Sequence, residues 1–216
     1  MGTTSTALGS LYSIQEDHRY LMPNDHTEQP HPTRVDGVDW GRWTPVDRGT
    51  LLFVVRHRQI LLIHKKRGLG AGNLNGPGGR LDPDESPLSG ALREVREELC
   101  IDAIDPSLIG ELQFQFIDGY SIHVFVFIAE EFTGVPTETD EAVPMWTPID
   151  HIPYDSMWED DRYWLPLLLD RRPFSGRFIF DGDLMLDHKL LETRDWKEWP
   201  LLGETMDNSI PEKATG

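Results

Sequence analysis

Three glutamates, Glu94, Glu97 and Glu98, follow a glycine-rich loop near the middle of this 216-residue chain. On a helix they occupy positions i, i+3 and i+4, so their carboxylates share one side within an arc of about 100°. Mg²⁺ prefers oxygen ligands and keeps several waters, so a few carboxylates and the phosphates of a substrate satisfy it. The glycines of residues 75–79 let the backbone approach a ligand closely. The pattern predicts a site for divalent metal and phosphate, whereas the alternative is a solvated acidic helix face.

A helix that would position these glutamates has a clear start in the sequence. Ser86 is a suitable N-cap, and Pro87 fits the first helical position, where the missing N–H costs nothing. From there apolar residues recur at steps of three and four, which predicts a stripe that packs against other elements. The stripe consists of Leu88, Ala91, Leu92, Val95 and Leu99.

The spacing of the whole segment resembles the Nudix box, the signature of hydrolases that cleave nucleoside diphosphates linked to another group. Gly79 is followed after five residues by Glu85, and after seven more by Arg93 and the glutamates. The resemblance implies an α/β Nudix fold, an α/β/α sandwich with a mixed central sheet. It also implies that the Gly79 carbonyl is a metal ligand and that an ion pair between Glu85 and Arg93 ties the loop to the helix. Cys100 replaces the usual glycine, so we expect the helix end to differ or to run slightly longer.

Two further segments resemble the mammalian-type MutT branch of this family, whose members hydrolyse oxidised purine nucleotides. Residues 65–76 match its loop, and residues 153–169 with the following Arg177–Gly182 stretch match its second half. By this resemblance Asn75 hydrogen-bonds the base, while Thr50 and Lys65 line the sugar and the entrance. Leu69 and Leu74 stand where that branch has aromatic residues, which leaves the ranking among oxidised purines open.

Trp158, Asp160 and Asp161 suit recognition of a base. An indole offers a flat face for a purine, a contact of about 1–3 kcal/mol in nucleic-acid binders. Two adjacent carboxylates do not both stay ionised when desolvated, so one should keep its proton and donate while its neighbour accepts. The alternatives are that Trp158 belongs to the core and that the two aspartates favour a helix N-terminus.

The resulting hypothesis is Mg²⁺-dependent hydrolysis of an oxidised purine nucleoside triphosphate to monophosphate and pyrophosphate, with Mn²⁺ as a substitute and nucleotide-pool sanitation as the role. Glu141 resembles a fourth acid near the metal, as ligand or base, or is a surface loop acid. The sequence leaves open which glutamate is the base. Three alternatives remain: a Nudix hydrolase acting on a dNTP, nucleotide sugar or dinucleotide polyphosphate, a catalytically silent nucleotide sensor, and an isomerase of prenyl diphosphates.

Composition limits the partners. With 20 basic and 37 acidic residues the formal net charge is −17, which argues against a nucleic-acid polymer or an anionic membrane. No stretch is long and apolar enough for a membrane span. The single cysteine fits a reducing compartment, so we expect a cytoplasmic protein. Monomer and homodimer both remain possible.

Patterning divides the chain into three parts. Residues 1–45 are expected to form an extension that wraps a surface or forms a dimer, 46–195 the Nudix hydrolase domain, and 196–216 an acidic mobile tail. Within the domain, alternating apolar residues predict strands, and residues 158–170 predict a second helix. The predicted strands cover residues 51–55, 59–64, 111–117, 120–129, 142–148, 176–180 and 184–190.

Overall fold

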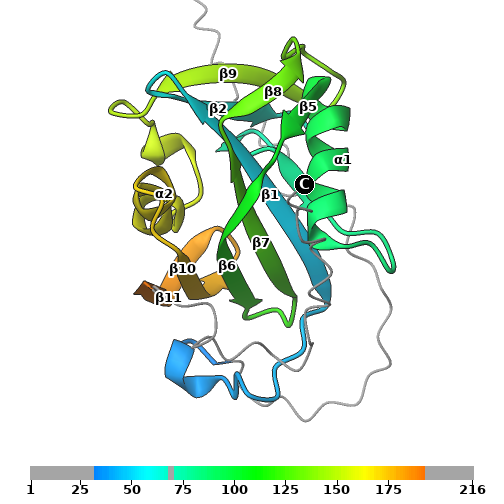
Figure 1. Cartoon of the computed structure of the whole chain (residues 1–216). Coiled ribbons are helices and arrows are strands. Elements are labelled where there is room, and N and C mark those ends of the chain that lie inside the picture. Colours follow the sequence, from blue (N-terminus) through cyan, green and yellow to red (C-terminus); the bar gives the residue numbers. More distant parts are fainter. Residues whose placement is uncertain (1–31, 68–70, 193–216) are drawn as a thin grey trace, which may run out of the picture. The chain divides into compact units, whose positions relative to one another are not determined.

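The computed structural model describes residues 32–67 and 71–192, which form a mixed sheet with helices on both faces (Figure 1). The helices are η1 Val35–Gly37, α1 Pro87–Leu99, η2 Tyr154–Ser156 and α2 Asp161–Leu169. The strands are β1 Asp47–Arg56, β2 Gln59–Lys65, β3 Leu74–Asn75, β4 Gly78–Arg80, β5 Ile101–Ile104, β6 Ser107–Phe116, β7 Ser121–Ala129, β8 Glu131–Gly134, β9 Ala142–Pro148, β10 Phe174–Asp181 and β11 Leu184–Glu192. All seven predicted strands are present. The short strands β3, β4, β5 and β8 were not predicted.

The main sheet has nine strands in the order β11-β10-β6-β7-β1-β2-β3, with β4 paired to β1 and β9 paired to β2. The β1–β7 and β6–β10 pairs are parallel, and the remaining pairs are antiparallel. A separate two-stranded sheet consists of β5 and β8. The predicted mixed central sheet is therefore confirmed.

Alternation along β1 separates two cores, because successive side chains of a strand point to opposite faces. Leu52 and Val54 join the core that contains the buried residues of α1. Phe53 joins the core that contains Trp164 and other residues of α2. Figure 1 shows the two helices on opposite sides of the strands, which confirms the expected α/β/α layering.

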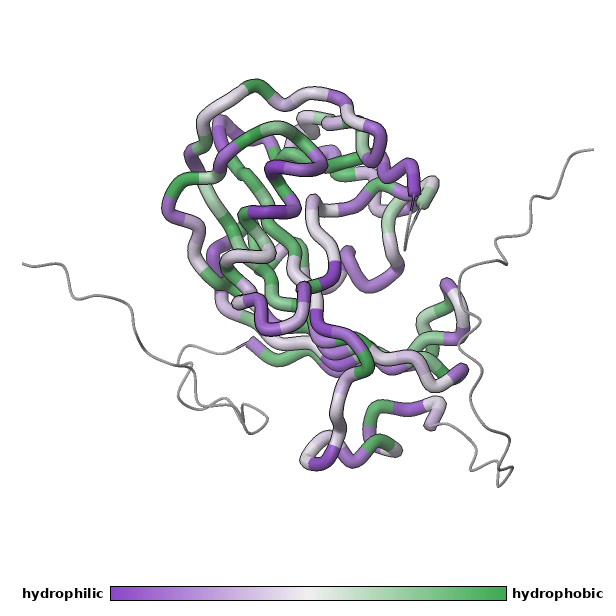
Figure 2. The backbone as a smooth tube through the Cα atoms, turned by 90° about the vertical axis from the view of Figure 1, so that its right-hand side faces the viewer, coloured by the Kyte–Doolittle hydropathy of each residue, from purple (hydrophilic) through white to green (hydrophobic). Residues whose placement is uncertain are grey.

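Hydropathy follows these layers. In Figure 2 the hydrophobic residues run along the central strands, and hydrophilic residues gather at the turns between them. Among the described residues no helix has the length and apolar character needed to cross a membrane.

Helix α1 begins as the sequence predicts and ends more abruptly than expected. The Ser86 side chain accepts a hydrogen bond from the Ser89 N–H, and Pro87 is the first helical residue. At the other end Cys100 takes the left-handed conformation that the family's glycine would take, with φ 59° and ψ 34°. The expectation of a different or longer helix end is therefore wrong, since Cys100 itself stops the helix at Leu99.

Helix α2 is shorter than predicted. It begins at Asp161, so Trp158 and Asp160 lie in the connection that follows η2. The Asp160 side chain does not cap the helix, because it instead accepts a hydrogen bond from Trp164 Nε1 at 2.8 Å. The first turn that periodicity alone suggested is therefore absent, and Asp160 instead contacts a side chain of the helix's own first turns.

Residues 32–46 pack on the part of the sheet that α1 leaves open. Trp40 and Trp43 are buried with Val35 against Ile179 of β10. The indole Nε1 of Trp43 donates to Gln115 Oε1 of β6 at 2.9 Å. Of the three predicted segments, residues 1–31 of the extension and the whole tail at 196–216 lie outside the described residues.

Candidate active site

A buried glutamate of α1 faces the glycine loop. Glu98 is 1% exposed, and its Oε2 accepts a hydrogen bond from the Gly78 backbone N–H at 2.8 Å. Gly78 has φ 154°, and a Cβ there would lie 2.0 Å from the Thr50 carbonyl oxygen, so only glycine fits. The glycine therefore allows the loop to lie close against β1, where its backbone N–H reaches Glu98.

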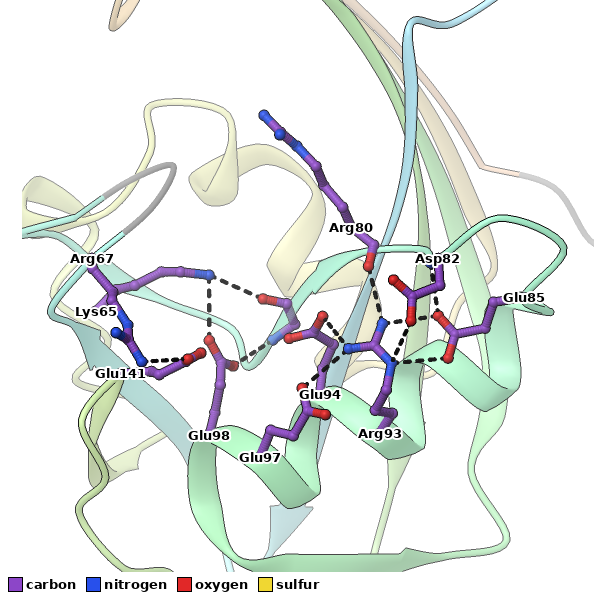
Figure 3. Close-up of polar contacts among 11 residues, drawn as sticks. Lys65, Arg67, Arg80, Asp82, Glu85, Arg93, Glu94, Glu97, Glu98 and Glu141 are labelled. Atoms are coloured by element: carbon purple, nitrogen blue, oxygen red, sulfur yellow. Dashed lines mark hydrogen bonds and ion pairs between the residues drawn. The ribbon is translucent and has the colours of Figure 1, made fainter. Parts of the chain in front are cut away.

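Lys65, at the end of β2, completes this contact. Its Nζ lies 3.3 Å from Glu98 Oε1 and donates to the Gly78 carbonyl oxygen at 3.0 Å (Figure 3). Burial raises the pKa of Glu98 to about 7, while Lys65 and the Gly78 N–H act in the opposite direction. Lys65 was expected to line the sugar and the entrance. In the structure its ammonium lies between Glu98 and the Gly78 carbonyl, which belong to the proposed metal site.

The other two glutamates share a single guanidinium. Arg93 Nη1 donates to Glu94 Oε1 at 2.8 Å and to Glu97 Oε2 at 3.1 Å. Burial raises the pKa of Glu94, and the hydrogen bond from Arg93 partly offsets this. The Glu94 side chain is 12% exposed and that of Glu97 54%, so the three carboxylates form a gradient from buried to solvated.

The expected ion pair between the loop and the helix is present. Arg93 makes a two-fold contact with Glu85, from Nε to Oε1 at 2.9 Å and from Nη2 to Oε2 at 2.8 Å. Its Nη2 also donates to the Arg80 carbonyl oxygen at 3.1 Å. The hydrogen bond from Arg93 is the largest cause of the lowered pKa of Glu85. The planar guanidinium of Arg93 therefore joins β4, the loop and α1, and it holds Glu94 and Glu97 against the glycine loop.

The carbonyl groups of the two loop glycines point in different directions. On either side of Gly79, the Leu52 N–H donates to the Pro77 carbonyl oxygen and the Leu81 N–H donates to the Arg48 carbonyl oxygen. Because hydrogen-bonded positions alternate along an antiparallel pair, the N–H and carbonyl of Gly79 point toward Thr50 of β1. The Gly79 oxygen accordingly lies 3.1 Å from where a Cβ of Gly49 would stand. The loop carbonyl on the side of Glu98 is that of Gly78, one residue before the position that the resemblance suggested.

The donor set suits a hard cation even though the carboxylates do not converge. Among residues 32–67 and 71–192, no three acidic, histidine or cysteine side chains are arranged to enclose a metal. However, the ammonium of Lys65 is already held between a carboxylate oxygen of Glu98 and the carbonyl oxygen of Gly78. A Cβ on Gly79 would stand 2.5 Å from Glu94 Oε1, so the missing side chain leaves room for that carboxylate. Oxygen donors around a position that attracts positive charge are the ligands that Mg²⁺ prefers.

A threonine joins the loop of Glu141, drawn in Figure 3, to the end of α1. Thr139 Oγ1 donates to the Glu98 carbonyl oxygen at 3.0 Å and accepts from the Glu141 N–H at 3.2 Å. The Glu141 carboxylate is 2.6 Å from Nη2 of Arg67. The structure thus brings this loop acid to the end of α1 that carries Glu98.

The residues expected to recognise a base lie around the start of α2. Trp158 is half-buried, with its ring edge-on to Phe180 at 5.8 Å between centroids. Asp160 and Asp161 are buried, with exposed fractions of 3% and 7%. Burial raises the pKa of Asp160 to about 6 and that of Asp161 well above its ordinary value, the latter also through the neighbouring Asp160. Burial therefore favours the protonated form of both carboxyl groups, and which of them would donate to a base stays a prediction.

Thr50 and Asn75 lie on strands between the two helices. Thr50 of β1 is 2% exposed, and its Oγ1 has no hydrogen-bond partner among the described residues. Asn75 of β3 is 9% exposed and pairs with Ile63 of β2. Within the described residues no hydrogen bond or ion pair joins Asp160 or Asp161 to the glutamates of α1.

Sequence reasoning missed three residues of this site: Arg67, Gly78 as the inward carbonyl, and Thr139. The sequence contains a signal for the first, since Arg67 follows two lysines in the loop that resembles the MutT branch. The direction of the Gly78 carbonyl depends on the pairing of β4 with β1, and β4 has only three residues. Such a short strand has too little periodicity to be predicted.

Comparison with known proteins is consistent with this geometry. The NUDIX domain model matches residues 43–168. The oxidized purine nucleoside triphosphate hydrolase of Danio rerio is 42% identical over 150 residues, which are 68% of this chain and 95% of that protein. The protein of the same name from Mus musculus is 39% identical over 145 residues, which are 66% of this chain and 93% of that protein.

A solved structure agrees in fold. The crystal structure of a MutT protein from Bacillus halodurans superposes with a TM-score of 0.61 and is 29% identical in sequence. The match covers 67% of this chain and 97% of that one. The two chains therefore share the arrangement of sheet and helices described above.

Proposed function

Because this chain belongs to the Nudix hydrolase family, we propose that it hydrolyses oxidised purine nucleoside triphosphates to the monophosphate and pyrophosphate with Mg²⁺. The observation that carries the choice of substrate is the buried pair Asp160 and Asp161 next to Trp158. Two similar proteins that carry the name of this activity support it over nearly their full length. Nucleotide-pool sanitation in the cytoplasm would be the role.

The acidic pair supplies a donor and an acceptor from adjacent residues. Burial and the neighbouring Asp160 raise the pKa of Asp161 and favour its protonated form, which can donate a hydrogen bond. Asp160, whose pKa is about 6, is largely ionised at pH 7 and accepts one. An oxidised purine differs from the normal base in its donors and acceptors, and a pair of this kind discriminates between them because an unmatched buried polar group is costly.

The glutamates would hold the cation and handle the proton of the attacking water. Glu94, Glu97 and Glu98 of α1, with the Gly78 carbonyl, are the groups that would hold Mg²⁺. When bound, the metal supplies positive charge for the phosphate oxygens and for the attacking water. Burial raises the pKa of Glu98 to about 7 in the metal-free chain, and a bound cation would favour the ionised carboxylate that holds it. Glu141 is a second acid at this end of the helix.

A panel of substrates tests the proposal. Pyrophosphate release with Mg²⁺ is measured for 8-oxo-dGTP, 2-hydroxy-dATP, dGTP, dATP, a nucleotide sugar and a dinucleotide polyphosphate. The proposal expects the highest kcat/KM for the two oxidised purines. A higher value for another substrate favours one of the alternative Nudix activities, and tight binding without pyrophosphate release favours a nucleotide sensor.

Two variants separate recognition from chemistry. Asp160→Asn should lower kcat/KM for 8-oxo-dGTP more than for dGTP. An equal loss for both substrates would contradict recognition of the oxidised base by the acidic pair. Asp155→Asn is its matched control, because Asp155 lies in the neighbouring η2 and its side chain is 98% exposed. Glu98→Gln should slow turnover at least about tenfold, which corresponds to about 1.4 kcal/mol of barrier. A smaller effect contradicts the assignment of Glu98.

A further inference from the structure

Each acid of the proposed metal site has a basic partner from the same chain. Arg93 contacts both Glu94 and Glu97, and the remaining two acids have a partner each. These two pairs are Lys65 with Glu98 at 3.3 Å and Arg67 with Glu141 at 2.6 Å (Figure 3). Each of the four carboxylates therefore has a basic partner without a metal, although only three cations face them within the described residues.

The Lys65–Glu98 pair differs from the others in its burial. The two side chains are 16% and 1% exposed, whereas those of Arg67 and Glu141 are 62% and 41% exposed. Exposed pairs contribute little and exchange readily with water, but a buried carboxylate that loses its partner is strongly destabilised. Lys65 is thus a basic partner whose removal should have a measurable effect on the protein.

The position of the Lys65 ammonium also matters. It lies between Glu98 Oε1 and the Gly78 carbonyl oxygen, which are two of the groups that would hold the cation. A divalent ion bound by the same oxygens would repel the ammonium strongly at this separation. Lysine has a long flexible stem, so the ammonium can leave Glu98 without a change in the backbone.

We propose that Lys65 is the resident counter-cation of this site: it holds Glu98 in the metal-free protein and competes with the divalent metal for that carboxylate. When the metal arrives, the ammonium leaves Glu98 and is free to contact the phosphates of the substrate. This inference rests on the proposed function, because it requires that Glu98 hold the metal. It assigns Lys65 a role opposite to that of a simple substrate-binding residue, since its loss should strengthen metal binding.

Binding of Mn²⁺ tests the proposal without any turnover. The electron paramagnetic resonance signal of free Mn²⁺ is titrated with the full chain at pH 8.5, and the dissociation constant is compared with that of Lys65→Met. The variant should bind Mn²⁺ at least tenfold more tightly. Lys66→Met is the matched control, because Lys66 is the next residue and its Nζ contacts Glu138 and the Thr139 carbonyl oxygen but no acid of the metal site. It should change the dissociation constant by less than twofold.

Thermal unfolding provides a second measurement. In EDTA, Lys65→Met should unfold at a lower temperature than the wild-type protein, because Glu98 then lacks its partner. Saturating Mn²⁺ should remove most of this difference, since the metal replaces the ammonium. A purely structural role for Lys65 predicts instead that the deficit persists with metal and that Mn²⁺ binding weakens.

The outcomes separate this inference from the proposed function. If the wild-type protein binds Mn²⁺ in a manner that Glu98→Gln abolishes, but Lys65→Met binds it equally or less well, only the role of Lys65 is wrong. If the wild-type protein shows no saturable Mn²⁺ binding that depends on Glu98, the metal site itself is wrong and both proposals fail.

Discussion

Replacing Glu98 by glutamine should change how the stability of the metal-free protein depends on pH. Burial raises the pKa of Glu98 from 4.5 to about 7 in the folded chain. Because the folded pKa is higher than the unfolded one, ionisation favours unfolding, and stability is lost as pH rises from about 4.5 to about 7. Between pH 5 and pH 8 this loss amounts to about 2–3 kcal/mol, at 1.36 kcal/mol for each unit of pKa. Glutamine has no such loss.

Urea unfolding in EDTA at pH 5 and pH 8 measures the effect. The quantity of interest is the unfolding free energy of Glu98→Gln minus that of the wild-type protein. All other titrating groups are common to both proteins and cancel to first order. The difference should rise by about 2–3 kcal/mol between the two pH values, whatever its value at pH 5.

Glu97→Gln is the control for this experiment. Its side chain lies on the same helix but is 54% exposed, so the same comparison should give a change below about 1 kcal/mol. A difference for Glu98→Gln that stays constant or falls between pH 5 and pH 8 would refute the reasoning. It would mean that Glu98 is solvated in the folded chain and does not face the glycine loop as described.

Three further substitutions test the elements that hold the site. Arg93→Met should lower the unfolding free energy by about 2 kcal/mol because the fork to Glu85 is lost, and Arg93→Lys should recover less than half of it in urea unfolding. Recovery by lysine would contradict the two-fold contact. Cys100→Gly should raise the urea midpoint by an amount equivalent to about 1 kcal/mol, because glycine adopts the left-handed conformation without strain, and an unchanged midpoint would count against it. Trp43→Ala should cost about 3 kcal/mol in thermal unfolding, whereas a loss below about 1 kcal/mol would show that residues 32–46 pack weakly.

The elements with strong periodicity were predictable from sequence alone. Ser86 and Pro87 fixed the start of α1, and alternating apolar residues located the long strands. The interpretation of residues 158–170 as one helix failed at its start, because periodicity does not reveal that Glu159 and Asp160 form a turn before α2. Local pattern is a guide to elements of several turns, but it does not determine their terminal residues.

The residue types of the candidate site were predictable from the sequence, but the directions in which their side chains and carbonyl groups point were less so. The spacing of Glu94, Glu97 and Glu98 is a local property of one helix, so it could be deduced. The position of the Lys65 ammonium depends on β2 and on a loop whose backbone follows β1. Such a contact across the sheet leaves no pattern along the chain, which is why Lys65 was assigned to the entrance by resemblance.

Analysis of the products of 8-oxo-dGTP tests the central claim most directly. The nucleotide is incubated with the full chain and Mg²⁺, and the products are separated by ion exchange, with Glu98→Gln as the parallel sample. Our account predicts the monophosphate and pyrophosphate in equal amounts, dependent on Mg²⁺ and strongly reduced in the variant. A diphosphate with inorganic phosphate, or equal turnover by the variant, would contradict it.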